Sequence, residues 1–250
     1  MRKNRFIISG GGTGGHIYPA LSIANKINES FNNAEIKFVG AIGKMEMNIV
    51  PKYGYNIHGL WISGLQRSFS LKNIVLPFKL IISLIQSIFI LIKYKPKFVI
   101  GTGGFASFPI VFISSILRIP TLIQEQNSFP GISNRLLSNH ANYISVAYDK
   151  MEKYFPSNKL FLTGNPVRKS ISNLNNLIDF KKKLKIDKSK IVISILGGSL
   201  GSDKINRTIE ENIDFIISQN IFIIWQCGKN YFKDYKKYNS DSVFVTDFID

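Results

Sequence analysis

The sequence is poor in cysteine, histidine and acidic residues, and each shortage excludes a class of protein or site. A single cysteine, Cys227, excludes an intramolecular disulfide and is typical of a reducing cytoplasm. The three histidines, His16, His58 and His140, lack the spacing of paired metal ligands, so no histidine metal site is expected. With 16 Asp and Glu against 32 Lys and Arg, the net charge is +16, which favours an anionic partner.

The basic residues are scattered along the chain and form no dense tract. A clustered basic stripe is the usual mark of a nucleic-acid binder, so a nucleic-acid partner is not expected. Phosphorylated substrates and anionic lipid headgroups remain as partners. The chain is also rich in lysine, isoleucine and asparagine, and such a compositional bias explains the charge equally well. Charge alone therefore selects no function.

Long apolar runs are scarce as well. The first run, residues 6–9, is too short for a signal peptide and is followed at once by glycines, which predicts a first β-strand. Residues 74–92 are the exception, since Lys79 is their only charged residue and a membrane-spanning helix needs about 20 apolar residues. A proline near the start and a polar stripe predict instead a buried or half-buried helix with its polar edge in water. Docking on a membrane surface and spanning a membrane are the alternatives.

Short apolar runs alternate with helical patterns, which predicts parallel β-sheets with crossover helices, the α/β class. Strands are expected at residues 6–9, 35–39, 97–100, 121–124, 143–146, 191–196, 221–226 and 243–246, and helices near 19–30, 45–53, 71–94, 133–139 and 204–219. A break rich in Gly and Pro predicts two domains, residues 1–163 and 164–250. The second offers fewer strands than the roughly five or six of a doubly wound domain, so it is predicted to be incomplete.

Three glycine-rich loops each follow a predicted strand and precede a predicted helix, at residues 10–15, 101–104 and 197–201. Glycine lets backbone N–H groups approach an anion at a helix N-terminus, which predicts phosphate binding without a metal. The first loop also matches the dinucleotide fingerprint, but no acidic residue ends the second strand, which argues against a nucleotide-dependent oxidoreductase. The alternative explanation for the glycines is that they serve tight packing of the backbone alone, and this alternative is strongest for the third loop.

Polar residues follow two of these strands. His16 comes directly after the first loop and is either a general base or a residue that caps the helix or orients a substrate. Residues 124–127, with the sequence QEQN, end another strand, where Glu125 can deprotonate a sugar hydroxyl or simply lie in a solvated loop. Arg168 stands at the domain break, where a guanidinium can reach a diphosphate.

Six motifs in order resemble those of the family 28 glycosyltransferases, which have the GT-B fold: GGGTGGH at 10–16, GTGGF at 101–105, EQN at 125–127, GNPVR at 164–168, GGS at 197–199 and TDFID at 246–250. The resemblance covers the whole chain and implies two Rossmann-like, doubly wound domains. It implies inverting transfer of GlcNAc from UDP-GlcNAc to the C4 hydroxyl of lipid I, the undecaprenyl-diphosphate-linked MurNAc-pentapeptide. The product is lipid II, a precursor of peptidoglycan.

The resemblance also implies roles for single residues, with residues 1–163 binding the acceptor and facing the membrane and residues 164–250 binding UDP-GlcNAc. His16 is the implied base or orienting residue, and Glu125 is a second candidate for the base. The implied donor contacts are Thr13, Gly14, Gly15, Asn127, Arg168, Ser199 and Ile249. The implied loops for the acceptor diphosphate contain Gly12, Gly14, Gly15, Gly103 and Gly104. No metal and no cofactor are expected.

The family likeness further implies a peripheral protein on the cytoplasmic face of the plasma membrane, in contact with anionic lipid and with other cell-wall synthesis proteins. The alternatives are a related lipid glycosyltransferase with another acceptor, such as a diacylglycerol, and an inactive membrane-associated scaffold. Gln124, Phe105 and Ser202 depart from the His, Tyr and Ala common in the family, which affects fine substrate contacts. The family's sugar-nucleotide contacts continue beyond Asp250, so we expect either a fragment or a shortened gene. If the protein ends at Asp250, weak or absent binding of UDP-GlcNAc is expected.

Overall fold

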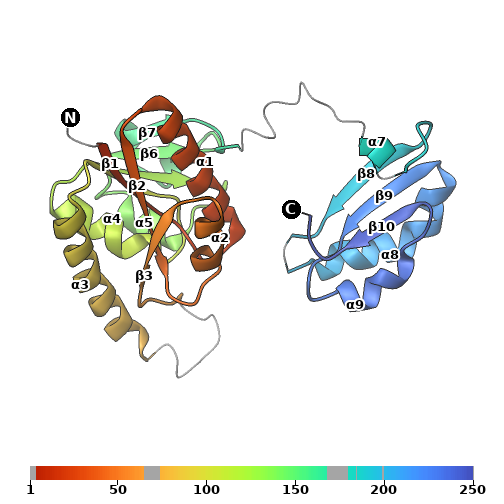
Figure 1. The fold of residues 1–250 in the computed structure, drawn as a ribbon, viewed down its shortest axis with the longest axis horizontal. Coiled ribbons are helices and arrows are strands. Elements are labelled where there is room, and N and C mark those ends of the chain that lie inside the picture. Colours follow the sequence, from red (N-terminus) through yellow and green to blue (C-terminus); the bar gives the residue numbers. More distant parts are fainter. Residues whose placement is uncertain (1–3, 65–73, 168–179, 184, 199, 250) are drawn as a thin grey trace. The chain divides into compact units, whose positions relative to one another are not determined.

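The computed structural model describes residues 4–64, 74–167, 180–183, 185–198 and 200–249. The chain divides into two compact units, residues 1–173 and 174–250, and Figure 1 shows the fold of each. Each unit is a parallel sheet covered by helices, as the alternation of apolar runs predicts. The domain boundary predicted between residues 163 and 164 stays a prediction.

The first unit contains a seven-stranded sheet in the order β3-β2-β1-β4-β5-β6-β7, and every neighbouring pair is parallel. Its strands are β1 Asn4–Ser9, β2 Ala34–Ala41, β3 Asn56–Leu60, β4 Phe98–Gly101, β5 Thr121–Glu125, β6 Tyr143–Val146 and β7 Leu160–Leu162. The strand order reverses at β1, which lies between β2 and β4. Open α/β sheets bind ligands at the carboxyl ends of the strands flanking such a reversal.

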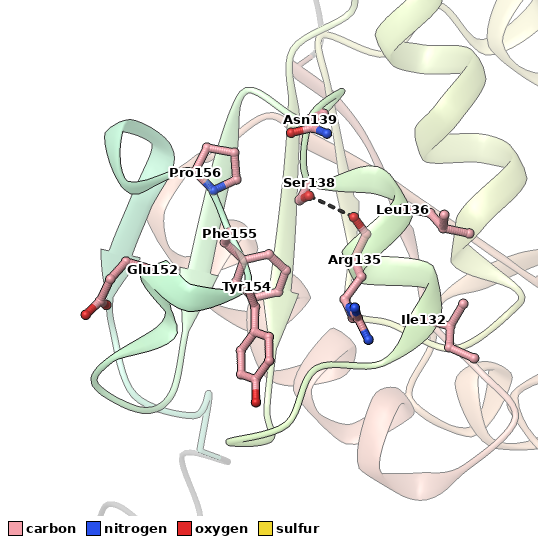
Figure 2. A pocket seen from close by; sticks show the side chains of 9 residues that line it. All are labelled: Ile132, Arg135, Leu136, Ser138, Asn139, Glu152, Tyr154, Phe155 and Pro156. Carbon is pink, nitrogen blue, oxygen red and sulfur yellow. Dashed lines mark hydrogen bonds between the residues drawn. The ribbon is translucent and has the colours of Figure 1, made fainter.

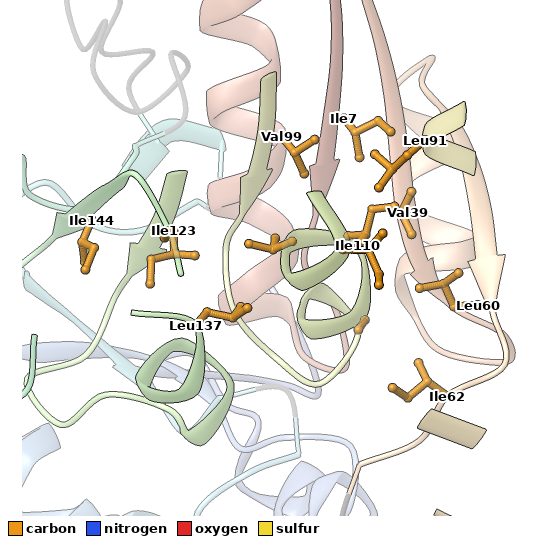
Figure 3. Packing of buried hydrophobic residues seen from close by; sticks show 14 of the residues in the cluster. Ile7, Val39, Leu60, Ile62, Leu91, Val99, Ile110, Ile123, Leu137 and Ile144 are labelled. Atoms are coloured by element: carbon orange, nitrogen blue, oxygen red, sulfur yellow. The ribbon is translucent and has the colours of Figure 1, made fainter. Parts of the chain in front are cut away.

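Helices cover both faces of this sheet (Figure 1). They are α1 Gly14–Ser30, α2 Glu46–Lys52, α3 Leu76–Tyr94, α4 Ser107–Ile116 and α5 Ile132–Leu137, with short 3-10 turns at Met151–Lys153 and Ser157–Lys159. Side chains alternate along β1, so Ile8 packs with α1 and α2 while Ile7 packs with α3, α4 and α5. Figure 3 shows the second of these cores, in which Ile110 of α4 lies against the strand residues Ile7 and Val99.

Three elements of this unit, α4, β3 and β7, have no counterpart among the predicted ones, and β7 is a strand of only three residues. Helix α4 is buried on most of its surface, so its sequence lacks the one-sided apolar period that marks a surface helix. Strand β3 is a short edge strand containing His58 and Gly59, which weakens its strand pattern. The first helix begins at Gly14, whereas we predicted Pro19, because the glycines of the loop form its first turn despite their low helix propensity.

Helix α3 buries two serines of its polar stripe and exposes apolar side chains, whereas we predicted that the polar stripe lies in water. Ser83 and Ser87 are fully buried and their hydroxyls donate to the carbonyl oxygens of Leu80 and Ser83, both at 2.7 Å, so this part of the polar stripe faces the core. The exposed side of the helix is apolar and consists of Phe78, Ile81, Ile82, Ile85, Phe89 and Ile92. By length and composition α3 is able to cross a membrane, and 17% of its apolar window is buried. The prediction that the polar edge lies in water was therefore wrong for both serines.

The second unit contains a three-stranded parallel sheet in the order β10-β9-β8. Its elements are α7 Phe180–Lys183, β8 Ile191–Leu196, α8 Asp203–Ser218, β9 Ile221–Gln226, α9 Phe232–Tyr235, a 3-10 turn Lys236–Tyr238 and β10 Val243–Thr246. Trp225 of β9 is fully buried and its ring lies 4.9 Å from that of Tyr235, centroid to centroid. The third glycine loop joins β8 to α8 at the carboxyl edge of this sheet.

Candidate active site

The first two glycine loops meet because they follow the adjacent strands β1 and β4. Thr102 connects them: its N–H donates to the carbonyl oxygen of Ser9 and its hydroxyl donates to that of His16, both at 2.8 Å. A Cβ atom on Gly104 would lie only 2.2 Å from the carbonyl oxygen of Gly11. Glycine in these loops therefore serves the close approach of one loop to the other, in addition to any approach of a ligand.

The first loop leads directly into the N-terminus of α1, a helix of 17 residues. The N–H groups of its first residues, Gly14 and Gly15, have no acceptor within the helix. Thr13 precedes them in extended backbone, and its hydroxyl makes no capping bond. The positive end of the helix dipole and these groups together suit a phosphate oxygen or a sugar hydroxyl. This arrangement is compatible with the roles predicted for Thr13, Gly14 and Gly15, which stay predictions.

The second loop encloses the ring of His16. Gly103 and Gly104 have left-handed backbone, with φ of +95° and +79°, a conformation that favours glycine. A Cβ atom on Gly103 would lie 2.9 Å from Nδ1 of His16, and one on Gly104 would lie 3.1 Å from its Cδ2 atom. The hydroxyl of Ser107, at the start of α4, donates to the carbonyl oxygen of Gly104 at 2.9 Å. The loop thus holds the imidazole by close packing.

Hydrogen bonds define the tautomer of His16. Its Nδ1 atom lies 3.0 Å from the carbonyl oxygen of Thr102 and 3.2 Å from Oε1 of Gln126. A carbonyl oxygen only accepts, so Nδ1 carries the hydrogen and Nε2 of the neutral ring keeps its lone pair. Gln126 also donates from Nε2 to the same Thr102 oxygen at 2.7 Å. The imidazole is therefore oriented with a proton-accepting nitrogen available, as both a base and an orienting residue require.

Glu125 lies at the end of β5 and is buried, and its carboxylate accepts four hydrogen bonds. Oε1 accepts from the backbone N–H and the Nδ2 atom of Asn127, at 3.0 and 2.9 Å. Oε2 accepts from the N–H of Gly131 and from Nδ2 of Asn134, at 3.0 and 2.9 Å. A carboxylate with this many donors organises the loop at 126–131, which favours His16 over Glu125 as the base. It also fixes the exposed Asn127, a predicted donor contact.

The predicted junction motif lies against the end of β5. Nδ2 of Asn165 donates to the carbonyl oxygen of Gln126, and Oδ1 of Asn165 accepts from Nε2 of Gln124, both at 3.4 Å. Asn165 thereby connects the start of the motif to the loop that contains Glu125 and Asn127. Arg168, the last residue of this motif, lies outside the described residues.

In the second unit, Gln226 connects two of the predicted donor-binding segments. Its carbonyl oxygen accepts from the N–H of Gly197 in the third glycine loop at 2.9 Å, and its Oε1 atom accepts from the N–H of Ile249 at 3.0 Å. The loop and Ile249 therefore lie at the same edge of the sheet. Ser199 lies outside the described residues. Sequence reasoning missed Gln226, which looks like an ordinary end of a strand. It also missed Glu46 of α2, which looks like a solvated first-turn acid but is buried and accepts the N–H of Gly12 in the first glycine loop.

A cavity of about 610 Å³ lies beside α5, away from the predicted residues. Figure 2 shows Arg135 of α5 and Tyr154 among its walls, with their polar ends pointing the same way. None of the residues predicted for catalysis or binding lines this cavity. Within the described part of the chain, no group of three or more His, Cys, Asp and Glu side chains is arranged to hold a metal ion.

Comparison with known proteins relates this chain to one family over most of its length. Residues 6–146 match the glycosyltransferase family 28 N-terminal domain, and residues 192–250 match the glycosyltransferase family 28 C-terminal domain. A relative from Flavobacterium psychrophilum is named UDP-N-acetylglucosamine--N-acetylmuramyl-(pentapeptide) pyrophosphoryl-undecaprenol N-acetylglucosamine transferase. It is 53% identical, over 100% of this chain and 69% of the relative. A protein of the same name from Christiangramia forsetii is 50% identical, over 98% of this chain and 67% of its own length.

Solved structures show the same fold. MurG from Acinetobacter baumannii aligns with a TM-score of 0.67 at 23% identity, covering 99% of this chain and 67% of that protein. A UDP-GlcNAc 2-epimerase from Neisseria meningitidis aligns with a TM-score of 0.64 at 17% identity, covering 98% of this chain and 72% of the epimerase. At these identities the structures establish the fold and nothing about the reaction.

Proposed function

Since this chain belongs to glycosyltransferase family 28, we propose that it transfers GlcNAc from UDP-GlcNAc to the C4 hydroxyl of lipid I and so forms lipid II. The predicted GT-B class of two Rossmann-like units is confirmed. The observation that carries the proposal is His16, held at the switch point of the first sheet between two glycine loops with a proton-accepting nitrogen available. Two relatives at 53% and 50% identity support the same reaction by their names.

The proposed reaction is a single displacement with inversion at C1 of GlcNAc. The C4 oxygen of the acceptor forms the new bond to C1, and the bond from C1 to the diphosphate oxygen breaks with its electron pair leaving on UDP. Nε2 of His16 accepts the proton of the hydroxyl. Backbone N–H groups of the glycine loops and the guanidinium of Arg168 stabilise the negative charge of the phosphates.

We assign the predicted residues to the two substrates as the family resemblance implies, with Gly14 and Gly15 serving both. The paired loops of the first unit, with Gly12, Gly14, Gly15, Gly103 and Gly104, bind the acceptor's diphosphate. The donor is held by Thr13, Gly14, Gly15, Asn127, Arg168, Ser199 and Ile249. Two contacts support the assignment of donor residues: Glu125 fixes the exposed Asn127, and Gln226 holds Ile249 beside the third glycine loop.

We further propose that the protein lies on the cytoplasmic face of the plasma membrane through α3. The exposed apolar side of this helix suits insertion into the boundary between headgroups and acyl chains. Lys93, Lys95 and Lys97 are exposed at its C-terminal end, where anionic headgroups attract them. A substrate carried on undecaprenyl diphosphate is itself confined to that surface. Contacts with other cell-wall synthesis proteins stay a prediction.

A transfer assay tests this function. The protein is expressed from its native gene, purified, and incubated with radiolabelled UDP-GlcNAc and a lipid I analogue, with a diacylglycerol as the matched acceptor control. Label is expected in the lipid I product and not in the diacylglycerol. Transfer to the diacylglycerol alone would contradict the proposed acceptor, and binding of lipid I without any transfer would contradict the proposed activity.

A further inference from the structure

Glu46, at the start of α2, is a fully buried carboxylate with no part in the mechanism described above. Its Oε1 atom accepts the N–H of Ala41, at the end of β2, at 3.0 Å. Its Oε2 atom accepts the N–H of Gly12, in the first glycine loop, at 2.9 Å. An ionised carboxylate is costly to bury unless donors of this kind satisfy it, so its position calls for an explanation beyond packing.

Two glycines make room for this side chain. A Cβ atom on Gly11 would lie 2.1 Å from Oε1 of Glu46, and one on Gly40 would lie 2.6 Å from its Cγ atom. Such distances are too short for any real Cβ contact, so neither position accepts a side chain while Glu46 stays in place. Gly11 therefore lacks a side chain because of Glu46, whatever ligand approaches the loop.

The carboxylate holds one peptide group in one orientation. The Gly11–Gly12 peptide directs its N–H to Glu46, and in a trans peptide the carbonyl oxygen points the opposite way. That oxygen faces Gly104, whose added Cβ would lie 2.2 Å from it. Turning the peptide over would set its carbonyl oxygen against the carboxylate. Since Gly104 packs on the ring of His16, a continuous series of contacts joins Glu46 to His16.

We propose that Glu46 is a positioning residue for the transfer reaction. Its carboxylate fixes the Gly11–Gly12 peptide, and that peptide holds the second glycine loop, and with it His16, in the reactive arrangement. Because Glu46 already uses the N–H of Gly12, this glycine contributes to the proposed diphosphate loop only by its small size, and donation of N–H groups to phosphate oxygens by the first loop falls to Gly14 and Gly15. The catalytic part of this inference rests on the proposed function, whereas the series of contacts does not.

The first test is steady-state kinetics of Glu46→Gln. The amide has one acceptor oxygen and one NH2 group, so either Gly12 or Ala41 faces a donor where it had an acceptor. We expect kcat per folded molecule to fall roughly 10- to 100-fold while the KM for UDP-GlcNAc stays within about twofold. Glu46→Asp keeps both oxygens and the charge on a shorter side chain and is expected to recover part of the loss. The matched control is Glu35→Gln, the same change on β2, where the carboxylate pairs with Arg5 at 3.3 Å.

The second test is NMR of protein labelled with 15N-glycine and 13C-histidine, which requires no turnover. In Glu46→Gln the Gly12 amide proton is expected to move upfield and the His16 ring signals to shift, whereas Glu35→Gln leaves both in place. Unchanged His16 signals, or a kcat per folded molecule within twofold of wild type, would overturn the positioning role. Absence of transfer by the wild-type chain would instead contradict the proposed function.

Discussion

The exposed apolar side of α3 gives a quantitative prediction for membrane binding. Phe78 and Phe89 are 65% and 68% exposed, and both belong to this side. A phenylalanine offers about 200 Å² for burial, so each presents roughly 130 Å² of apolar surface to its surroundings. At ~25 cal/mol per Å², full transfer of that surface from water to hydrocarbon is worth about 3 kcal/mol for each ring.

A helix lying in the membrane interface buries its apolar side only partly. We therefore take about half of the full value, or ~1.5 kcal/mol for each ring, which is roughly a tenfold change in the partition coefficient. The double variant Phe78→Ser with Phe89→Ser is expected to bind vesicles about 100-fold more weakly than wild type. Because both side chains point away from the core, the Tm of the first unit is expected to change little.

The measurement is cosedimentation with vesicles of phosphatidylglycerol and phosphatidylethanolamine over a range of lipid concentrations. Phe215→Ser is the matched control, since Phe215 is 66% exposed on α8 of the second unit. It removes the same side chain from a comparable environment that we do not assign to the membrane. Binding of the double variant within twofold of wild type would refute the reasoning, and so would an equal loss in Phe215→Ser.

Three further outcomes follow from single side chains. His16→Ala is expected to lower kcat by roughly 100- to 10,000-fold, the usual contribution of a general base, and a loss below tenfold in steady-state assays contradicts that role. Glu125→Gln sets an NH2 group against N–H donors, which is expected to lower the free energy of unfolding by ~2–3 kcal/mol. Calorimetry should then show a Tm lower by roughly 4–12 °C. An unchanged Tm means that the four hydrogen bonds are dispensable. The hydroxyl of Tyr238 and the charge of Lys237 lower the pKa of Glu210 from its usual 4.5, so its stabilising effect is present near neutral pH and is lost as the pH falls through the lowered pKa. The Tm advantage of wild type over Glu210→Gln should therefore be largest at about pH 6–7 and shrink as the pH falls below the usual pKa of 4.5, and a difference independent of pH excludes this linkage.

The candidate site divides into parts that the sequence predicts and parts that it does not. The glycine loops and His16 are visible in the sequence because their chemistry is local: glycine gives the backbone freedom, and the loop follows a strand and begins a helix. The roles of Glu125 and Glu46 are not visible there. Each role depends on donors brought from elsewhere in the fold, and Gly12 is 34 residues away from Glu46.

The sequence by itself determined the α/β class, most of the strands and the three loops, since each follows from short-range periodicity and from the conformational freedom of glycine. Tertiary structure alone decided which side of α3 faces the core. Helical spacing places Ser83 and Ser87 on one stripe and Phe78 and Phe89 on another, but it does not show which stripe meets the sheet. That choice depends on close packing against the strands, where small serines bonded to their own helix fit and phenylalanines are left outside.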